Sequence, residues 1–314
     1  MSRALVLTPG DPQGIGPEVA CRALVARPPA RPVLLVGDPE PVRREAEACG
    51  LELAPLDAHD LPTGAVGLLP PPPGPEPVEV RALRWAVAAC LDGRAAGLVT
   101  GPIHKARLAA QGFAHAGHTD FLGALCGVER PVMAFTGGEL RVALVTVHLP
   151  LARVPAAVTS EGVLHTVCRA HEALRDQLGL PAPRLVVCGL NPHAGDDGLL
   201  GREELEVIGP AVRAARAQGV DARGPVSAEA AFLDARAGRA DLVVAMYHDQ
   251  GLAPLKAVDF GRSVNWTLGM PIVRTSVDHG TADDLVGTGR ADPSSMVAAL
   301  ELASQLADVR EGRA

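Results

Sequence analysis

Short apolar strands alternate with helical segments along most of this 314-residue chain, and this alternation limits the folds it can adopt. A strand expected at 4–8 leads through a glycine-rich loop at 10–18 into a helix, where Pro17 suits the first turn. A second strand, at 33–36, is followed by a helical segment at 39–48. Strands and helices in this order predict a parallel α/β sheet.

The pattern changes in the middle of the chain. Strand-like runs at 132–136 and 140–148 are joined by Gly137-Gly138, a dipeptide that suits a hairpin turn. An antiparallel hairpin inside an α/β chain indicates a second lobe or a subunit contact. Before the hairpin, a helix at 80–92 and a strand at 96–100 are expected. After it the alternation resumes, with strands at 184–190, 242–246 and 271–277 and helices at 203–218, 227–237 and 295–310.

The composition argues against several classes of partner. The net charge of −7 comes from scattered acids and bases without a basic face, so neither nucleic acid nor a membrane surface is an expected partner. The six cysteines never form a C-x-x-C pair, which favours reduced thiols over a disulfide framework or a thiolate metal site. With no apolar leader and no 18-residue apolar run, the expected location is the cytoplasm and the expected ligand a small molecule.

Three histidines occupy equivalent places, each just after an apolar strand: His148, His193 and His248. A single histidine at such a place is more often structural. Ligands gather at the carboxyl ends of the strands in open α/β sheets, however, and three imidazoles can form a metal site with open positions. The repeated placement therefore favours a catalytic zinc or a similar divalent ion.

A second group of residues suits an anion. His118 and Thr119 begin a helix after Gly117, where backbone N–H groups and the helix dipole favour a phosphate. Lys256, Asn265 and Arg274 could add a point charge, amide donors and a planar fork from elements that return to one cleft. A helix cap and a solvated surface charge are the simpler alternatives for Thr119 and Arg274.

Two glycine-rich loops suit a nucleotide. The loop at 10–18 differs from the G-x-G-x-x-G fingerprint, so alone it is weak support for a dinucleotide. The loop at 278–289 is long and polar, with glycines that let a ligand approach the backbone and acids that could bind ribose hydroxyls. An ordered surface loop is the alternative.

Seven motifs, taken in order, closely resemble the 4-hydroxythreonine-4-phosphate dehydrogenase family of vitamin B6 biosynthesis, the PdxA family. They are GDPQGIGPE, TGPIHK, GHTDFL, VTVHLPL, NPHAG, MYHDQGLAPLK and TSVDHGTADD. The resemblance runs from about residue 5 to residue 300. It implies a two-lobed α/β fold of the isocitrate/isopropylmalate dehydrogenase-like type, with the active-site cleft between the lobes.

The resemblance also divides the chain and implies a homodimer. Residues 1–126 plus 266–314 would form the cofactor-side lobe, and residues 127–265 the lobe for metal, substrate and dimerisation. The active site would lie at the dimer interface, with both subunits contributing to the metal site.

The resemblance assigns roles residue by residue. His148, His193 and His248 would bind the divalent metal, with zinc expected and magnesium or cobalt as alternatives. The phosphorylated four-carbon hydroxy acid would be bound by His118, Thr119, Lys256, Asn265 and Arg274. The NAD or NADP cofactor would contact Gly14, Gly280, Thr281 and Asp284. Asp249 and Lys256 are the catalytic candidates for a general base, and a metal-bound water is a third.

The implied reaction is oxidation of 4-(phosphooxy)-L-threonine to 2-amino-3-oxo-4-(phosphooxy)butanoate, which decarboxylates to 3-amino-2-oxopropyl phosphate. Glu229 stands where the family commonly has Asp, which leaves 4-phospho-D-threonate or 4-phospho-D-erythronate as an alternative substrate. A zinc hydrolase or lyase with three histidine ligands is the alternative from another class, although it leaves both glycine loops without a role. A non-catalytic phosphometabolite-binding protein would leave the histidines unexplained.

Overall fold

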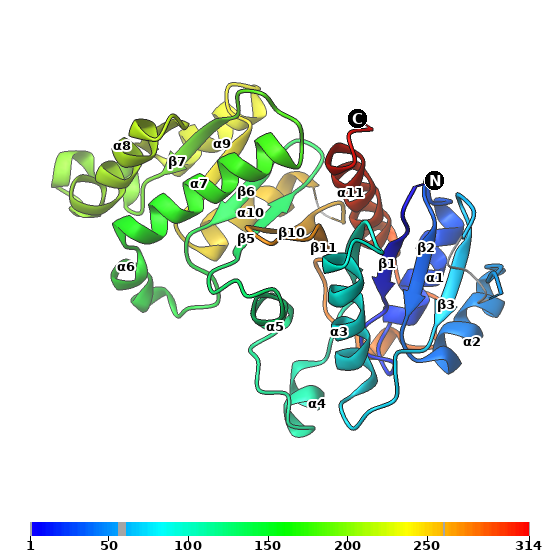
Figure 1. Cartoon of the computed structure of the whole chain (residues 1–314). Coiled ribbons are helices and arrows are strands. Elements are labelled where there is room, and N and C mark those ends of the chain that lie inside the picture. Colours follow the sequence, from blue (N-terminus) through cyan, green and yellow to red (C-terminus); the bar gives the residue numbers. More distant parts are fainter. Residues whose placement is uncertain (1, 56–60, 260, 314) are drawn as a thin grey trace. The chain divides into compact units, whose positions relative to one another are not determined.

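The computed structural model describes residues 2–55, 61–259 and 261–313, and the chain divides into two compact units (Figure 1). The first unit comprises Met1–Pro131 and Met270–Arg313, and the second comprises Val132–Gly269. The family resemblance predicts boundaries after residues 126 and 265. The division of cofactor, metal and dimer roles between the units stays a prediction.

The first unit contains a parallel sheet with strand order β3-β2-β1-β4-β11. Its strands are β1 (Leu5–Thr8), β2 (Val33–Val36), β3 (Val66–Leu69), β4 (Gly97–Thr100) and β11 (Arg274–Ser276). Its helices are α1 (Gly16–Ala26), α2 (Pro39–Cys49), α3 (Val78–Leu91), α4 (Lys105–Ala110), α5 (His118–Leu125), η4 (Asp283–Leu285) and α11 (Ser294–Arg310). The predicted parallel α/β sheet is confirmed here.

Helices cover both faces of this sheet. Leu98 of β4 belongs to the buried core that includes the apolar side chains of α3. Its neighbour Val99 faces the other way and pairs in register with Thr275, whose hydroxyl donates to the Ala299 carbonyl of α11 at 2.9 Å. Because successive side chains on a strand alternate between faces, α3 and α11 lie on opposite sides of the sheet.

The second unit contains a mixed sheet with strand order β10-β5-β6-β9-β7-β8. Its strands are β5 (Val132–Thr136), β6 (Arg141–Leu144), β7 (Arg184–Cys188), β8 (Asp221–Val226), β9 (Leu242–Ala245) and β10 (Val264–Leu268). Its helices are η1 (Leu151–Arg153), α6 (Val154–Ala157), α7 (Ser160–Asp176), η2 (Pro192–Gly198), η3 (Glu204–Ile208), α8 (Gly209–Ala217), α9 (Ala228–Arg236) and α10 (His248–Asp259). The predicted hairpin is confirmed: β5 pairs antiparallel with β6, and β10 pairs antiparallel with β5.

The segment after β9 differs from what its sequence suggests. Gly251 follows a polar run and suits a tight turn that leads to Lys256, but residues 248–259 form the helix α10. Gly251 is needed for close packing rather than for a turn, because a Cβ there would lie 2.7 Å from side-chain carbons of Val142 and Leu144 on β6. Lys256 therefore projects from a helix.

Among the residues that the structure describes, no helix is both long and apolar enough to cross a membrane.

Candidate functional site

The three histidines follow three neighbouring strands of the second unit. Strands β6, β9 and β7 are adjacent and parallel, so their carboxyl ends lie at one edge of the sheet. His148 and His248 follow β6 and β9, and their ring centroids are 5.7 Å apart. His193 follows β7, within η2. This edge is where an open α/β sheet binds its ligands.

Backbone hydrogen bonds and strain fix the loops that carry these side chains. Thr146 donates from both its backbone N–H and its hydroxyl to the carbonyl oxygen of Met246, at 3.1 Å and 2.8 Å, which joins the ends of β6 and β9. His148 and His193 both have left-handed backbones, with φ of 24° and 54°. This conformation costs a non-glycine residue about 1–2 kcal/mol, so surrounding contacts must hold it.

His248 is oriented by the residue next to it. Its Nδ1 lies 2.7 Å from the Oδ1 atom of Asp249, which favours the tautomer with a proton on Nδ1. The other ring nitrogen, Nε2, then has its lone pair available for a metal, and a carboxylate behind a metal-binding histidine is a common arrangement. In this geometry Asp249 orients His248.

The spacing of the His148 and His248 rings fits a divalent metal. Two imidazoles on one tetrahedral zinc have ring centroids on the order of 5 Å apart, close to the separation of His148 and His248. Within residues 2–55, 61–259 and 261–313, no group of three or more His, Cys, Asp or Glu side chains could hold a metal ion. His193 is therefore not brought into a three-ligand cluster within a single chain.

A cationic site surrounds the start of α5 in the first unit. Arg274 on β11 is 1 % exposed, and its Nη2 donates to the Thr100 hydroxyl at 2.8 Å. Burial lowers the pKa of Arg274 to about 9, which leaves the guanidinium charged at neutral pH. Lys105 lies beside Gly117, because a Cβ on Gly117 would lie 3.7 Å from the Lys105 Nζ atom.

His118 is neutral in these surroundings. Burial lowers the pKa of its imidazole to about 3, and the like charges of Arg274 and Lys105 add to the effect. Its Nε2 atom is buried and has no hydrogen-bond partner among the described residues. Thr119 follows in the first turn and is half-buried. An anion at this helix start would meet both positive charge and a free ring nitrogen.

The other predicted anion ligands belong to the second unit. Lys256 lies on α10, and Asn265 lies on β10, paired in register with Phe135 of β5. Both side chains are half-buried. The predicted phosphate ligands are thus divided between the two units. Lys105, one of only two lysines in the chain, was not among the predicted phosphate ligands.

The two glycine-rich loops contact one another in the first unit. The Ile15 N–H donates to the Thr281 carbonyl at 3.0 Å, and a Cβ on Gly14 would lie 2.9 Å from the Thr281 Cβ. Gly280 and Asp284 are exposed. The structure therefore brings together Gly14 and Thr281, two of the predicted cofactor residues.

An ion-pair bridge joins the same two loops. Arg107 of α4 binds Asp11 of the first loop, with an Nη1 to Oδ2 distance of 2.7 Å, and also pairs with Asp283 of the second loop. Asp11 is 2 % exposed, so the bridge anchors a buried carboxylate. The hydrogen bonds to Thr281 and Arg107 lower the pKa of Asp283, which keeps it ionised.

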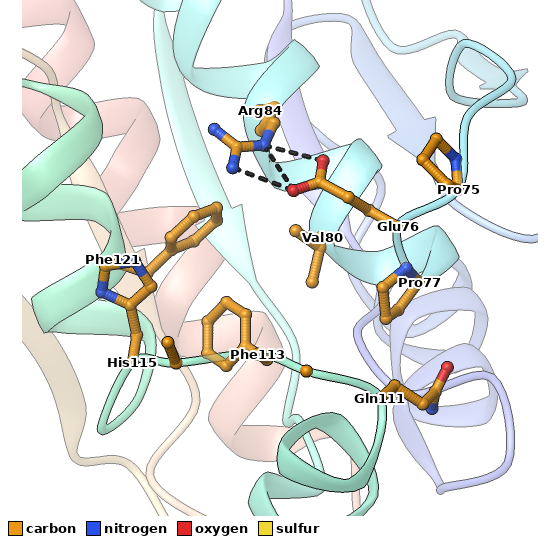
Figure 2. Close-up of a pocket in the computed structure, with 11 residues that line it drawn as sticks. Pro75, Glu76, Pro77, Val80, Arg84, Gln111, Phe113, His115 and Phe121 are labelled. Carbon is orange, nitrogen blue, oxygen red and sulfur yellow. Dashed lines mark hydrogen bonds and ion pairs between the residues drawn. The ribbon is translucent and has the colours of Figure 1, made fainter.

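A separate pocket of 330 Å³ lies beside the loop that precedes α5 (Figure 2). Phe113, His115 and Phe121 form an aromatic cluster with ring centroids 5.0 to 5.3 Å apart. Glu76 accepts two hydrogen bonds from the Arg84 Nε atom and one from Nη2, at 2.8 to 3.1 Å. Because this pair is neutralised internally, the pocket does not duplicate the cationic site at His118.

The chain has close relatives of known name and structure. Residues 35–303 match the family model described as "Pyridoxal phosphate biosynthetic protein PdxA". The 4-hydroxythreonine-4-phosphate dehydrogenase of Stenotrophomonas maltophilia (strain R551-3) is 47% identical over 324 residues, which cover 99% of both chains. The solved structure of 4-hydroxythreonine-4-phosphate dehydrogenase from Klebsiella pneumoniae has a TM-score of 0.87 and 35% identity, covering 98% of this chain and 100% of that chain.

A more distant structure agrees with the predicted fold. A β-decarboxylating dehydrogenase from Thermococcus kodakarensis has a TM-score of 0.50 and 16% identity, covering 98% of this chain and 83% of the other, and this likeness concerns the fold alone. The predicted two-lobed α/β fold class is confirmed. On the family match and the near full-length identity, the chain belongs to the PdxA family of pyridoxal phosphate biosynthetic proteins.

Proposed function

We propose that this protein oxidises 4-(phosphooxy)-L-threonine with a nicotinamide cofactor, giving 2-amino-3-oxo-4-(phosphooxy)butanoate, which then loses carbon dioxide. The observation that carries the proposal is the buried, unpartnered Nε2 of His118 near two cationic side chains, a site suited to the phosphate that the relatives' substrate carries. The names of the relatives supply the reaction type.

The neutral imidazole of His118 has a definite use in phosphate binding. Arg274 and Lys105 supply the positive charge, and the neutral ring can donate a single N–H to a phosphate oxygen. Lys256 and Asn265 are the other proposed phosphate contacts. Binding the phosphate firmly at a distance from the reacting carbon turns binding energy into orientation.

We further propose that His148, His193 and His248 hold a divalent metal, with zinc as the favoured ion and ligands contributed by both subunits of a homodimer. When bound, the metal acts as a Lewis acid on the substrate alcohol while the nicotinamide accepts a hydride. Asp249 holds the ring of His248 in place, so Lys256 is the better candidate for the proton acceptor. Gly14, Gly280, Thr281 and Asp284 are the proposed cofactor contacts.

The reaction is tested by following reduced-cofactor absorbance with metal-loaded protein and either NAD or NADP. The substrates to compare are 4-(phosphooxy)-L-threonine, 4-phospho-D-threonate and 4-phospho-D-erythronate. Preference for the amino acid supports the proposal, whereas preference for a sugar acid keeps the chemistry and changes the substrate. Absence of turnover with all three would favour the hydrolase, lyase or binding-protein alternatives.

The metal ligands are tested by His248→Ala, with His165→Ala on α7 as the matched control. We expect His248→Ala to lose both bound metal and turnover, and the control to keep both. Unchanged metal stoichiometry in His248→Ala would exclude this histidine as a ligand.

A shared site is tested by mixing subunits of His193→Ala and His248→Ala, because the rings of His148 and His248 already lie 5.7 Å apart within one chain. Each mixed dimer would regain one intact site if His193 and His248 of a site come from different subunits. No recovery on mixing would contradict a metal site shared between subunits.

A further inference from the structure

Glu204 is a buried carboxylate beneath the loop that carries His193. It begins η3, a single π-helical turn, and is 4 % exposed. A buried carboxylate is strongly unfavourable unless it is paired or hydrogen-bonded, so its contacts show what it is needed for.

The carboxylate binds the chain just where it leaves β7. Its Oε1 atom accepts hydrogen bonds from two successive backbone N–H groups, those of Leu190 at 2.7 Å and Asn191 at 2.8 Å. Its Oε2 atom accepts from the side-chain Nδ2 of Asn191 at 3.0 Å. Hydrogen bonds to an ionised acceptor are stronger than neutral ones. Together the three bonds set the direction in which the loop starts.

The loop then wraps closely around the same carboxylate. Residues 193–197 are all left-handed, with φ between 46° and 83°. A Cβ on Gly195 would lie 2.5 Å from the Glu204 Oε2 atom, and one on Gly189 would lie 3.0 Å from Oε1. Such a strained run persists only where neighbouring groups hold it. Glu204 is the polar group at the centre of this loop.

A second side chain ties the loop to the neighbouring strand. The Gln250 Nε2 donates to the Gly189 carbonyl at 2.7 Å, and its Oε1 accepts from the Met246 N–H at 2.6 Å. Gln250 thus joins the end of β7 to the end of β9, where His248 begins α10. The start of the His193 loop is held from both sides.

We infer that Glu204 is a positioning residue for His193: its carboxylate holds the loop in the conformation that presents the imidazole as a metal ligand. The inference rests on the proposed function, because it requires His193 to bind the metal. In this role Glu204 acts through the His193 loop and not directly on the metal or the substrate. Groups that orient metal ligands in this way commonly change metal affinity by about 10- to 100-fold when they are replaced.

The test is Glu204→Gln, which keeps the shape of the side chain but turns one acceptor into a donor. One oxygen can still accept from the two backbone N–H groups, while the new NH₂ group faces the NH₂ group of Asn191. We expect Co²⁺ affinity to fall by about 10- to 100-fold and the visible absorption spectrum of the bound Co²⁺ to change. Amide exchange at Leu190 and Asn191 should become faster.

Glu203→Gln is the matched control. Glu203 is the adjacent residue and accepts from the same Asn191 Nδ2 at 2.7 Å, but its backbone hydrogen bonds are with Arg202 and Glu203 itself, and it is only half-buried. Its Co²⁺ affinity and spectrum should stay close to those of the wild type. If Glu204→Gln fails to fold, Asn191→Ala serves instead, since it removes one bond to the carboxylate and should give a smaller loss of affinity.

The outcomes separate this inference from the proposed function. If the wild type binds no Co²⁺ or Zn²⁺, the proposed metal site is wrong and the inference falls with it. If the wild type binds metal and Glu204→Gln binds it with the same affinity and spectrum, only the positioning role is overturned. If Glu203→Gln loses as much affinity as Glu204→Gln, the effect is one of local charge, which also overturns it.

Discussion

His118 should remain uncharged throughout the physiological pH range, and this has a measurable effect on stability. Burial and two nearby cations lower the pKa of its imidazole to about 3, whereas a histidine in the unfolded chain titrates near 6.5. Between these values the unfolded chain binds more protons than the folded one. The free energy of unfolding therefore contains a contribution that is complete above pH 6.5 and is lost progressively as the pH falls towards 3.

The size of this contribution follows from the pKa difference. Each pH unit within the window is worth up to about 1.4 kcal/mol, so lowering the pH from 6.5 to 4.5 removes at most about 2.7 kcal/mol. His118 as a whole residue is half-buried, and solvent at its exposed atoms reduces the effect. We expect a loss of about 1–2.5 kcal/mol from this side chain over those two units.

The assay compares wild type with His118→Asn, which cannot titrate in this range. Urea unfolding at pH 6.5 and at pH 4.5 gives the change in the free energy of unfolding of each protein. The difference between the two changes is the contribution of His118. Nitrogen NMR of the ring should show a neutral imidazole at pH 5. A ring that titrates near pH 6.5, or identical pH dependences for the two proteins, would refute the reasoning. Inorganic phosphate should raise the measured pKa of His118, because a bound dianion favours the imidazolium.

Two further predictions concern the loops and the guanidinium. Gly14→Ala should lower the free energy of unfolding of the cofactor-free protein by about 1–3 kcal/mol in thermal or urea unfolding, because the new Cβ would overlap Thr281. At Gly280 a Cβ meets nothing within 4 Å, so Gly280→Ala should leave that stability unchanged and weaken only NAD binding. Equal destabilisation by the two would contradict this. Arg274→Lys should lower kcat/KM for the phosphorylated substrate by about 10- to 100-fold, because lysine lacks the planar fork; a wild-type kcat/KM would remove Arg274 from the phosphate site.

Much of the fold follows from local sequence signals, as particular elements show. The apolar run at 33–36 is β2 itself, and Gly137-Gly138 joins the predicted hairpin. The misread segment after β9 shows where local signals fail. A glycine suits both a turn and a tight packing contact. At Gly251 only the position of β6 against the helix distinguishes these two roles. That position depends on residues about a hundred places earlier in the chain.

In the candidate site, too, some residues can be found from local sequence, whereas others depend on contacts with residues distant in the chain. A histidine at a strand end can be found from sequence, because strand and side chain are neighbours in the chain. Glu204 could not be found, because it lies in a run that also contains Glu203 and Glu206, and sequence offers no reason to choose among them. The structure distinguishes them by burial, because the loop after β7 folds over Glu204, which lies 13 residues after Asn191. Candidate ligand residues are therefore easier to find in this sequence than the residues that hold their loops in place.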